Sequence, residues 1–331
     1  MAMRVGAIGY YLPEEVTNDE LLARVAAGSG PGVDLKRLER KLILNEAETR
    51  CFIGPEETAV DMAEKAARRC LERSGCQAQD IDLILYAGMK REYVEPAMSV
   101  LLQDRLGAKN ANAFDLSNAC LGFLNAMEVA KLYIDSGRYQ KILVVSAETG
   151  SEWIPWDKFT GESEMAGFSA LTVSDAAAAM LLEEGGDEKS FGLFEFKTFG
   201  EYHDLCQIRI GKGGDDLKLL VESRQLAITA IEILSEFIPR FLHKAIEHLG
   251  GLDIWFPHQV TGNPKRFFGK LEDELHDICY NSFLKVGNTG SLSIPLGMAL
   301  AEEEGALKRG DKVALIVGAS GFSYGGACLV Y

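Results

Sequence analysis

The sequence is poor in paired cysteines, in cations and in long apolar runs. Its seven cysteines are odd in number and form no CxxC pair, which argues against a disulfide scaffold and a metal knuckle. Lys and Arg number 34 against 49 Asp and Glu, and the net charge of −15 argues against a general nucleic-acid surface. No charged-then-apolar signal segment follows Met1, and no apolar run is long enough to span a bilayer. We therefore expect a cytoplasmic protein with no metal, no cofactor, no membrane span and no nucleic-acid partner.

What the sequence does have is an ordinary globular composition, with 47% hydrophobic and 25% charged residues over 331 positions. This length suggests two domains or two fused halves with a sizeable core. Apolar runs typical of strands, at residues 4–11, 81–87 and 141–147, alternate with segments of helical periodicity. Thr17 and Glu20 form a capping-box pattern at the start of one helix. The alternation predicts an α/β fold with a largely parallel or mixed sheet covered on both faces.

A weak internal repeat indicates how this fold is organised. Residues 114–147 have the pattern of a strand, a polar turn, a helix and an apolar strand. Residues 283–319 repeat that order, so we also expect a strand from residue 283. Each half then closes with a strand of small residues, at 175–182 and 325–331. We expect a duplicated α/β unit with one site between its two facing turns.

The repeat also predicts where the chain divides. We expect an N-terminal half at residues 1–183, which carries the candidate nucleophile, and a C-terminal half at residues 184–331. The first half has about a score of extra residues near 151–168, which include Trp153 and Met165 and lack a clear periodicity. We interpret them as a loop near the site or near a subunit interface.

Cys120 lies where an apolar strand at residues 113–116 meets a helical pattern that begins at Leu121. The N-terminus of a helix carries partial positive charge and unpaired N–H groups, which favour a thiolate over a thiol. Gly122 leaves room for backbone or substrate to approach closely. This is the geometry of a nucleophile on a sharp turn. The alternative is a cysteine that packs as a small buried hydrophobe, as we expect for Cys70 in an apolar helical stripe.

His258 and Asn288 are the other candidate residues. His258 directly follows a buried strand, and the active sites of open α/β sheets collect at strand ends. Asn288 lies in a turn between Gly287 and Gly290 that opens a helix. The alternatives are a hydrogen-bonded core histidine and an asparagine that only caps its helix.

Together the three residues make one chemistry coherent. A thiolate at Cys120 attacks a thioester, while a neutral imidazole and an amide donate hydrogen bonds to a developing enolate or oxyanion. Backbone N–H groups near Cys120 and at residues 318–322 are candidates for a second oxyanion hole. Because Asn288 adds no charge, it keeps His258 neutral and useful as a donor.

These motifs, taken in order, resemble the β-ketoacyl-ACP synthase III branch of the thiolase superfamily over nearly the full length. The segments that carry the resemblance are residues 8–13 with 17–21, 118–123, 257–259, 287–289 with 293–295, and 310–311 before the terminal Gly-rich strand. The resemblance implies a thiolase-like five-layered αβαβα fold, a homodimer and ping-pong acyl transfer. It further implies that Cys120 takes the acyl group and that His258 and Asn288 support decarboxylation of a malonyl thioester and condensation. By the same resemblance, Gly321 and Cys120 form the oxyanion hole.

The sequence departs from this family in the segment at residues 38–52. The family has a Trp and an Arg-Thr-Gly-Ile run there, which help to hold coenzyme A. Here the Trp is missing, and only Thr49 and Arg50 are faintly similar. The departure argues against acetyl-CoA priming of fatty-acid synthesis.

Glu95, just before Pro96, is a second departure. The family position is usually apolar and reaches the acyl pocket of the partner subunit. A carboxylate there is a candidate general base, acting in the partner subunit, that would allow condensation without decarboxylation. The long-chain olefin-forming condensing enzymes work this way, and the chain also resembles them around Cys120. The alternative is a solvated loop charge beside Arg91 and Glu92.

A small basic cluster of Lys265, Arg266 and Lys270 follows His258 in an otherwise acidic chain. Such a cluster suits an acidic carrier protein or a CoA phosphate. The alternative is a solvated helix face.

The leading hypothesis is therefore a condensing acyltransferase that joins two acyl thioesters, carried on CoA or on acyl carrier protein. Fatty-acid-like, specialised lipid or polyketide biosynthesis would use this reaction. Three alternatives stay open from sequence: acyl transfer to an alcohol or amine, a non-catalytic partner subunit, and a Cys/His/Asn hydrolase.

Overall fold

The computed structural model describes the whole chain except residues 1, 160–167, 187–189, 210–218, 264–267 and 269–270. A five-stranded sheet has the order β1-β7-β6-β4-β5. Its strands are β1 (Met3–Tyr11), β4 (Leu83–Tyr86), β5 (Asn112–Asp115), β6 (Lys141–Thr149) and β7 (Asp175–Glu184). β4 runs parallel to both β5 and β6, whereas β7 is antiparallel to β6 and β1. The sheet is therefore mixed, as the sequence predicts.

A second sheet repeats this arrangement with the order β11-β12-β13-β8. Its strands are β8 (Phe191–Thr198), β11 (Ile254–Pro257), β12 (Lys312–Ala319) and β13 (Ser323–Val330). β11 is parallel to β12, and β13 is antiparallel to β12 and β8. The strands of the first sheet lie within residues 3–184 and those of the second within 191–330, while the division of the chain into two halves stays a prediction.

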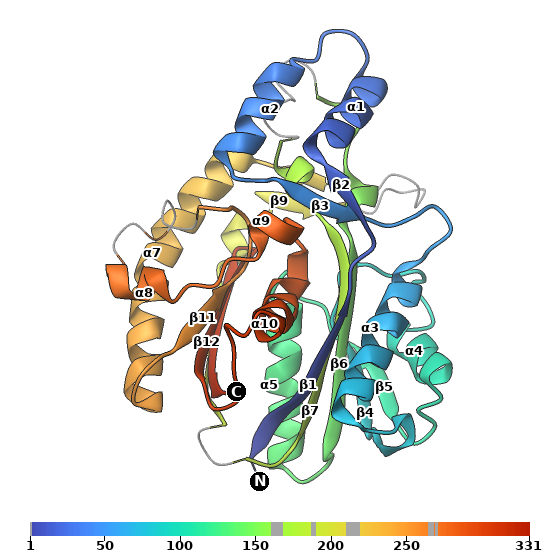
Figure 1. Cartoon of the computed structure of the whole chain (residues 1–331), viewed down its shortest axis with the longest axis vertical. Helices are drawn as coiled ribbons and strands as arrows, with labels where there is room; N and C mark the ends of the chain where they lie inside the picture. Colours follow the sequence, from blue (N-terminus) through green and yellow to red (C-terminus); the bar gives the residue numbers. More distant parts are fainter. Residues whose placement is uncertain (1, 160–167, 187–189, 210–218, 264–267, 269–270) are drawn as a thin grey trace.

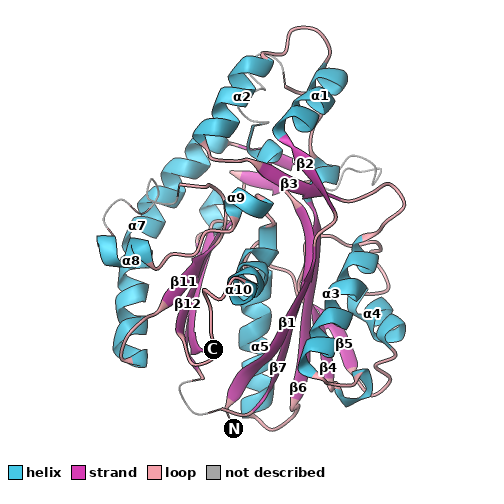
Figure 2. Ribbon diagram, viewed as in Figure 1, coloured by secondary structure: helices cyan, strands magenta, loops and turns pink. Residues whose placement is uncertain are grey.

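The sheets and helices form five layers (Figures 1 and 2). Helices α5 (Gly122–Asp135) and α10 (Ser293–Glu303) lie between the two sheets, and one apolar core joins these four elements. Helices α3 (Ala59–Ser74) and α4 (Met98–Leu106) cover the outer face of the first sheet. Helix α7 (Ser223–Leu249) covers the outer face of the second sheet. The five-layered αβαβα fold is thereby confirmed.

The segment of residues 14–52 lies at one end of the two sheets, above the central helices in Figure 1. Thr17 accepts from the N–H of Glu20, and the Glu20 carboxylate accepts from Thr17, so the predicted capping box is present. The remaining elements are β2 (Glu14–Thr17), α1 (Asn18–Ser29), α2 (Leu35–Leu44), β3 (Thr49–Phe52), β9 (Cys206–Ile208), β10 (Leu219–Val221), α8 (Asp273–Asp277) and α9 (Phe283–Val286), with short 3₁₀ turns at Ala78–Asp80, Gly150–Trp153, Ser169–Thr172, Gly200–Tyr202 and Gly290–Leu292. Within the described residues, no helix is long and apolar enough to cross a membrane.

The strand expected from residue 283 is wrong, because Phe283–Val286 forms the short helix α9. The Asn281 side chain accepts from the N–H of Phe283 at 2.9 Å, and this local hydrogen bond favours a helical turn over an extended strand. The fifth strand position of the second sheet is reduced to a single bridge between Trp255 and Cys279. The duplication is therefore imperfect at this edge.

Candidate active site

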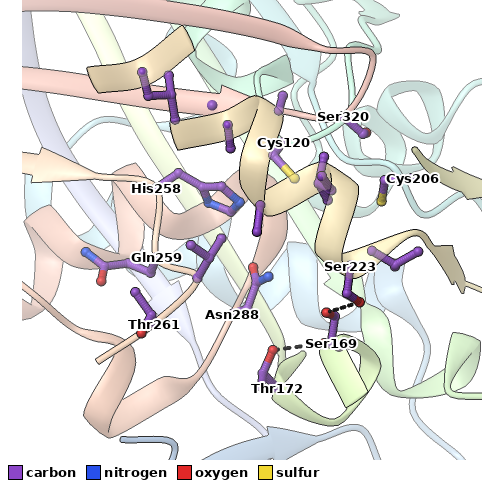
Figure 3. Close-up of a pocket in the computed structure, with 18 of the residues that line it drawn as sticks. Cys120, Ser169, Thr172, Cys206, Ser223, His258, Gln259, Thr261, Asn288 and Ser320 are labelled. Carbon is purple, nitrogen blue, oxygen red and sulfur yellow. Dashed lines mark hydrogen bonds between the residues drawn. The ribbon is translucent and has the colours of Figure 1, made fainter. Parts of the chain in front are cut away.

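A cavity of about 310 Å³ lies between the turn before α5 and the turn before α10. Cys120, His258 and Asn288 all line it, and Figure 3 shows their side chains arranged around one space. They come from the turn before α5, from the end of β11 and from the turn before α10. The structure thus brings together three residues that the sequence separates by as many as 168 positions.

Cys120 is presented by a tight turn between β5 and α5. Ala119 has φ of 46°, in the left-handed region that side chains rarely adopt, and the N–H of Leu121 donates to the Asn118 carbonyl at 3.0 Å. Gly122 opens the helix, and a Cβ there would lie only 2.6 Å from the carbonyl oxygen of Ala87. The turn therefore requires glycine next to the cysteine, so that the helix can start close against β4.

The expectation that the helix end favours a thiolate at Cys120 is wrong for the resting protein. Burial raises the pKa of the Cys120 thiol well above its usual range, and Cys206 and Glu148 raise it further. The cysteine therefore rests as a thiol and must lose its proton when a thioester arrives.

His258 is held from two sides. Its backbone N–H donates to the Ile316 carbonyl at 2.8 Å, and its ring Nδ1 lies 2.7 Å from the Ser293 hydroxyl oxygen. The other ring nitrogen, Nε2, is left to face the cavity (Figure 3). Burial lowers the pKa of His258 to about 4, so the imidazole is neutral at physiological pH. A neutral imidazole that carries its proton on Nε2 can donate a hydrogen bond to a developing anion.

Asn288 both caps its turn and serves the cavity. Its backbone N–H donates to Thr172 at 2.8 Å, and its carbonyl accepts from the N–H of Ser174 at 2.8 Å. Its side-chain oxygen accepts from the N–H of Gly290 at 3.0 Å. The side-chain NH₂ makes no hydrogen bond within the described residues, so it is available to a ligand in the cavity. The side-chain oxygen of Asn288 therefore caps the turn, as the alternative interpretation predicts, while its NH₂ group does not.

The turn between β12 and β13 borders the cavity opposite Asn288. Gly318, Ala319, Ser320 and Phe322 line it, and Gly321 has φ of 135°, which favours glycine. Gly321 is not itself a lining residue. Its assignment to an oxyanion hole stays a prediction.

The structure does not place the remaining candidates at this cavity. Glu95 is exposed on the segment that joins β4 to α4, and it does not line the cavity of its own protomer. The basic residues Lys265, Arg266 and Lys270 lie outside the described residues. Of the extra segment at 151–168, Met165 is likewise outside them, but Phe168 lines the cavity.

The cavity continues along one face of α7 as an apolar arm. Leu226, Ala230, Leu234 and Ile238 recur every four residues and all line it. A few polar groups interrupt the arm near its mouth, where the Ser169 and Ser223 hydroxyls lie 2.9 Å apart. An apolar channel with scattered polar groups suits an acyl chain or the amide-bearing arm of a thioester carrier.

Sequence reasoning missed two groups close to Cys120. Cys206, on β9, lines the same cavity, and burial raises its pKa to about 11. Glu148 is buried near the end of β6 and raises the pKa of Cys120. The only signal for Glu148 was a carboxylate inside an otherwise apolar strand.

Two family models match the chain. The model described as 3-Oxoacyl-[acyl-carrier-protein (ACP)] synthase III matches residues 114–200, and the model of its C-terminal part matches residues 242–331. Together they match just over half of the chain. The matched parts contain Cys120, His258 and Asn288.

Known proteins resemble the chain over its whole length. A β-ketoacyl-[acyl-carrier-protein] synthase III from Methylococcus capsulatus is 29% identical, covering 99% of this chain and 98% of the relative. The solved 3-oxoacyl-[acyl-carrier-protein] synthase III from Aquifex aeolicus superposes with a TM-score of 0.81 at 25% identity, covering 99% of this chain and 100% of that one. An OleA variant from Xanthomonas campestris gives a TM-score of 0.82 at 24% identity, with coverage of 100% and 98%, and shows the fold alone.

Proposed function

The chain belongs to the 3-oxoacyl-[acyl-carrier-protein] synthase III family of condensing acyltransferases, in the thiolase superfamily, and from this premise we propose a ping-pong condensation of two acyl thioesters through an acyl-Cys120 intermediate. The observation that carries the proposal is the meeting of Cys120, His258 and Asn288 in one cavity with an apolar arm. The donor and the acceptor are acyl-CoA or acyl-carrier-protein thioesters. The product serves fatty-acid-like, specialised lipid or polyketide biosynthesis.

In the first half-reaction the Cys120 sulfur attacks the carbonyl carbon of the donor thioester as the thiol loses its proton. The carbonyl oxygen becomes an oxyanion, and we expect the backbone N–H groups of Cys120 and Gly321 to stabilise it. The intermediate collapses, the carbon–sulfur bond of the donor breaks, and the carrier thiol leaves with a proton. Cys120 then holds the acyl group as a thioester.

In the second half-reaction an extender thioester becomes an enolate, either by loss of CO₂ or by loss of an α-proton. The enolate oxygen accepts from the neutral His258 ring and from the Asn288 NH₂ group. The enolate carbon attacks the acyl-Cys120 carbonyl, a carbon–carbon bond forms, and the Cys120 sulfur leaves and is reprotonated. The product is a β-ketoacyl thioester.

The intact mass of the protein after incubation with a panel of acyl-CoAs tests this proposal. We expect an increase by the mass of one acyl group, with a preference for some chain lengths, because the cavity has a finite apolar arm. Adding malonyl-CoA, and separately malonyl-acyl-carrier-protein, to the acylated protein separates the two routes, since only a decarboxylating enzyme discharges the adduct with release of CO₂ from one of them. The proposal fails if neither acyl-CoA nor acyl-carrier-protein donors acylate the protein.

We infer that the protein acts as a homodimer through the edge of the first sheet. β5 is the last strand of that sheet, and no other described strand pairs with its outer edge. Close to it, the segment between β4 and α4 exposes apolar side chains, with Val94 99% exposed and Tyr93 53% exposed. Exposed apolar tips of this kind suit a contact with a second copy.

In such a dimer Glu95 would reach the cavity of the partner as a general base. We expect Glu95→Gln to slow condensation by about 100-fold, the usual contribution of a positioned base, while acylation of Cys120 proceeds at the wild-type rate. Single-turnover acylation and product formation measure the two steps. Glu56→Gln, an exposed carboxylate outside this segment, is the control. Wild-type rates for both steps in Glu95→Gln would make Glu95 an ordinary surface charge.

The basic cluster of Lys265, Arg266 and Lys270 would dock an acidic carrier protein. Reversing these charges should raise the Michaelis constant for carrier-bound substrate by about tenfold and leave that for a short pantetheine thioester unchanged, because only the carrier protein meets the cluster. The exposed Lys308, reversed in the same way, is the control. An equal effect on both substrates would contradict a docking role.

A further inference from the structure

Glu148 is a buried carboxyl group that takes no part in the steps above. It is the penultimate residue of β6, and it is only 2% exposed. Ser146, two positions earlier, lies on the same face of the strand, toward the turn before α10. No cation pairs with Glu148 in the part of the chain that the structure describes, so its carboxyl group depends on hydrogen-bond donors.

Two of those donors come from opposite halves of the fold. Glu148 Oε1 accepts from the N–H of Met89 at 3.0 Å and from the hydroxyl of Ser291 at 2.5 Å. The Ser291 hydroxyl oxygen also lies 2.8 Å from that of Ser146. The other carboxyl oxygen, Oε2, is buried with no partner in the described chain. Glu148 therefore links the first sheet to the turn at Gly290–Leu292.

That turn determines where Asn288 and His258 lie. The Asn288 side-chain oxygen accepts a hydrogen bond from the N–H of Gly290. The hydroxyl of Ser293, which follows the turn, lies 2.7 Å from Nδ1 of His258. Gly290 has φ of 59°, and a Cβ there would lie 3.5 Å from Cγ of Glu148. The turn thus packs directly against the Glu148 side chain, so a change at Glu148 is transmitted to both residues.

We propose that Glu148 is a positioning residue for the condensation step: by holding Ser291 it fixes the turn that presents Asn288 and orients His258. The inference rests on the proposed condensing function. Cys120 is presented by a separate turn before α5, so its acylation depends less on Glu148. If Asn288 and His258 are displaced, only the stabilisation of the enolate is weakened. A displacement of about 1 Å in such a group lowers the rate by about 100-fold.

Glu148 also acts on Cys120 through its charge. Burial raises the pKa of Glu148 to about 7, and hydrogen bonds from Ser291 and Met89 partly oppose this rise. Within the described residues its charge raises the pKa of Cys120, from the turn before α5, and that of Tyr86, from β4. An ionised Glu148 raises the pKa of Cys120, so removing the charge must lower that pKa and increase the thiolate fraction at a given pH.

Four variants separate these effects. Glu148→Ala removes the acceptor, Glu148→Gln keeps an oxygen acceptor without the charge, and Ser291→Ala removes one donor. Asp82→Asn is the matched control, because Asp82 accepts from the N–H groups of Gln140 and Lys141 at the opposite end of β6. For each, the melting temperature, the rate of Cys120 acylation, the rate of condensation and the rate of alkylation by iodoacetamide at pH 8 are measured.

We expect Glu148→Ala to slow condensation by about 100-fold and to change the rate of acylation by less than about fivefold in either direction. Ser291→Ala should slow condensation by about tenfold, the effect of one lost hydrogen bond. Glu148→Gln should restore condensation to within about fivefold of wild type and react severalfold faster with iodoacetamide. Asp82→Asn should lower the melting temperature and leave both enzymatic rates at wild-type values.

The proposal is overturned if Glu148→Ala condenses at the wild-type rate, or if its acylation and condensation fall in parallel, as general damage would produce. If Glu148→Ala does not fold, wild-type condensation by Ser291→Ala overturns it instead. Failure of the proposed condensing function is distinguishable from failure of this positioning role, because the wild-type protein would then form no acyl adduct with any donor. Iodoacetamide needs no thioester, so an unchanged alkylation rate in Glu148→Gln contradicts the charge coupling in either case.

Discussion

Replacing Cys120 with alanine is expected to abolish acyl transfer. The acyl group can then form no covalent bond with the protein, and the condensation loses its intermediate, so turnover should fall by about 10⁴-fold or more. Alanine keeps the backbone N–H of residue 120 and removes only the sulfur. Binding of the thioester in the cavity should therefore survive while its chemistry does not.

Intact mass and product formation measure this loss directly. The acyl adduct seen with wild type should be absent from Cys120→Ala at every chain length. Cys76→Ala is the matched control, because Cys76 lies after α3 and does not line the cavity. This variant should form the same adduct and turn over at the wild-type rate. An adduct that persists in Cys120→Ala would move the nucleophile elsewhere, and Cys206 is the other cysteine that lines the cavity.

The reactivity of the Cys120 thiol should depend on pH. Because burial holds the pKa of the thiol above its usual range, the thiolate fraction increases with pH throughout the neutral region. The rate of alkylation by iodoacetamide should accordingly rise with pH from 6 to 9 without a plateau. The helix end would have produced a plateau near neutrality if it had controlled the pKa.

Much of this site could be predicted from short stretches of sequence, for a physical reason. A strand that becomes a helix at Cys120, a strand that ends before His258 and a Gly-flanked turn at Asn288 are local patterns. In a duplicated α/β fold, strand ends and helix starts collect at one edge of the sheets, so local patterns predict a shared location. The five layers, in contrast, followed from the family resemblance, while the local patterns predicted only a mixed sheet covered by helices on both faces.

Features that depend on distant contacts could not be predicted in this way. The pKa of Cys120 is raised by burial and, through their charges, by Cys206 and Glu148, which lie far from it along the chain. The partner of Glu148 is Ser291, 143 positions away, and no local pattern links the two. The helix at Phe283–Val286 depends on the Asn281 side chain, a competition that periodicity alone does not resolve.

Asn288→Asp should eliminate condensation while acylation continues. Aspartate has nearly the same shape, and its oxygen can still accept from the N–H of Gly290, so the turn should keep its structure. It replaces the NH₂ donor with a negative charge that repels the enolate. Losing one donor of an anion site costs about 10²–10³-fold in rate, and the added charge should bring the loss to at least about 10³-fold.

The neighbouring His258 offers a second readout of the same variant. Burial lowers the pKa of His258 to about 4 in wild type, so its neutral form persists from pH 5 upward and condensation should vary little through this group between pH 6 and 8. A carboxylate at position 288 stabilises the imidazolium and moves that pKa upward. The pKa, measured from the ring-proton NMR shift of His258, should therefore rise in Asn288→Asp.

Asn288→Ala separates the two effects of the aspartate variant, because it removes the NH₂ donor without adding a charge. It should lose about 10²-fold in condensation and leave the pKa of His258 unchanged, whereas Asn288→Asp should lose more and raise it. Equal losses in the two variants, with no change at His258, would mean that Asn288 acts only as the cap of its turn. A larger loss in the aspartate variant, with acylation intact, would place the amide at the developing negative charge.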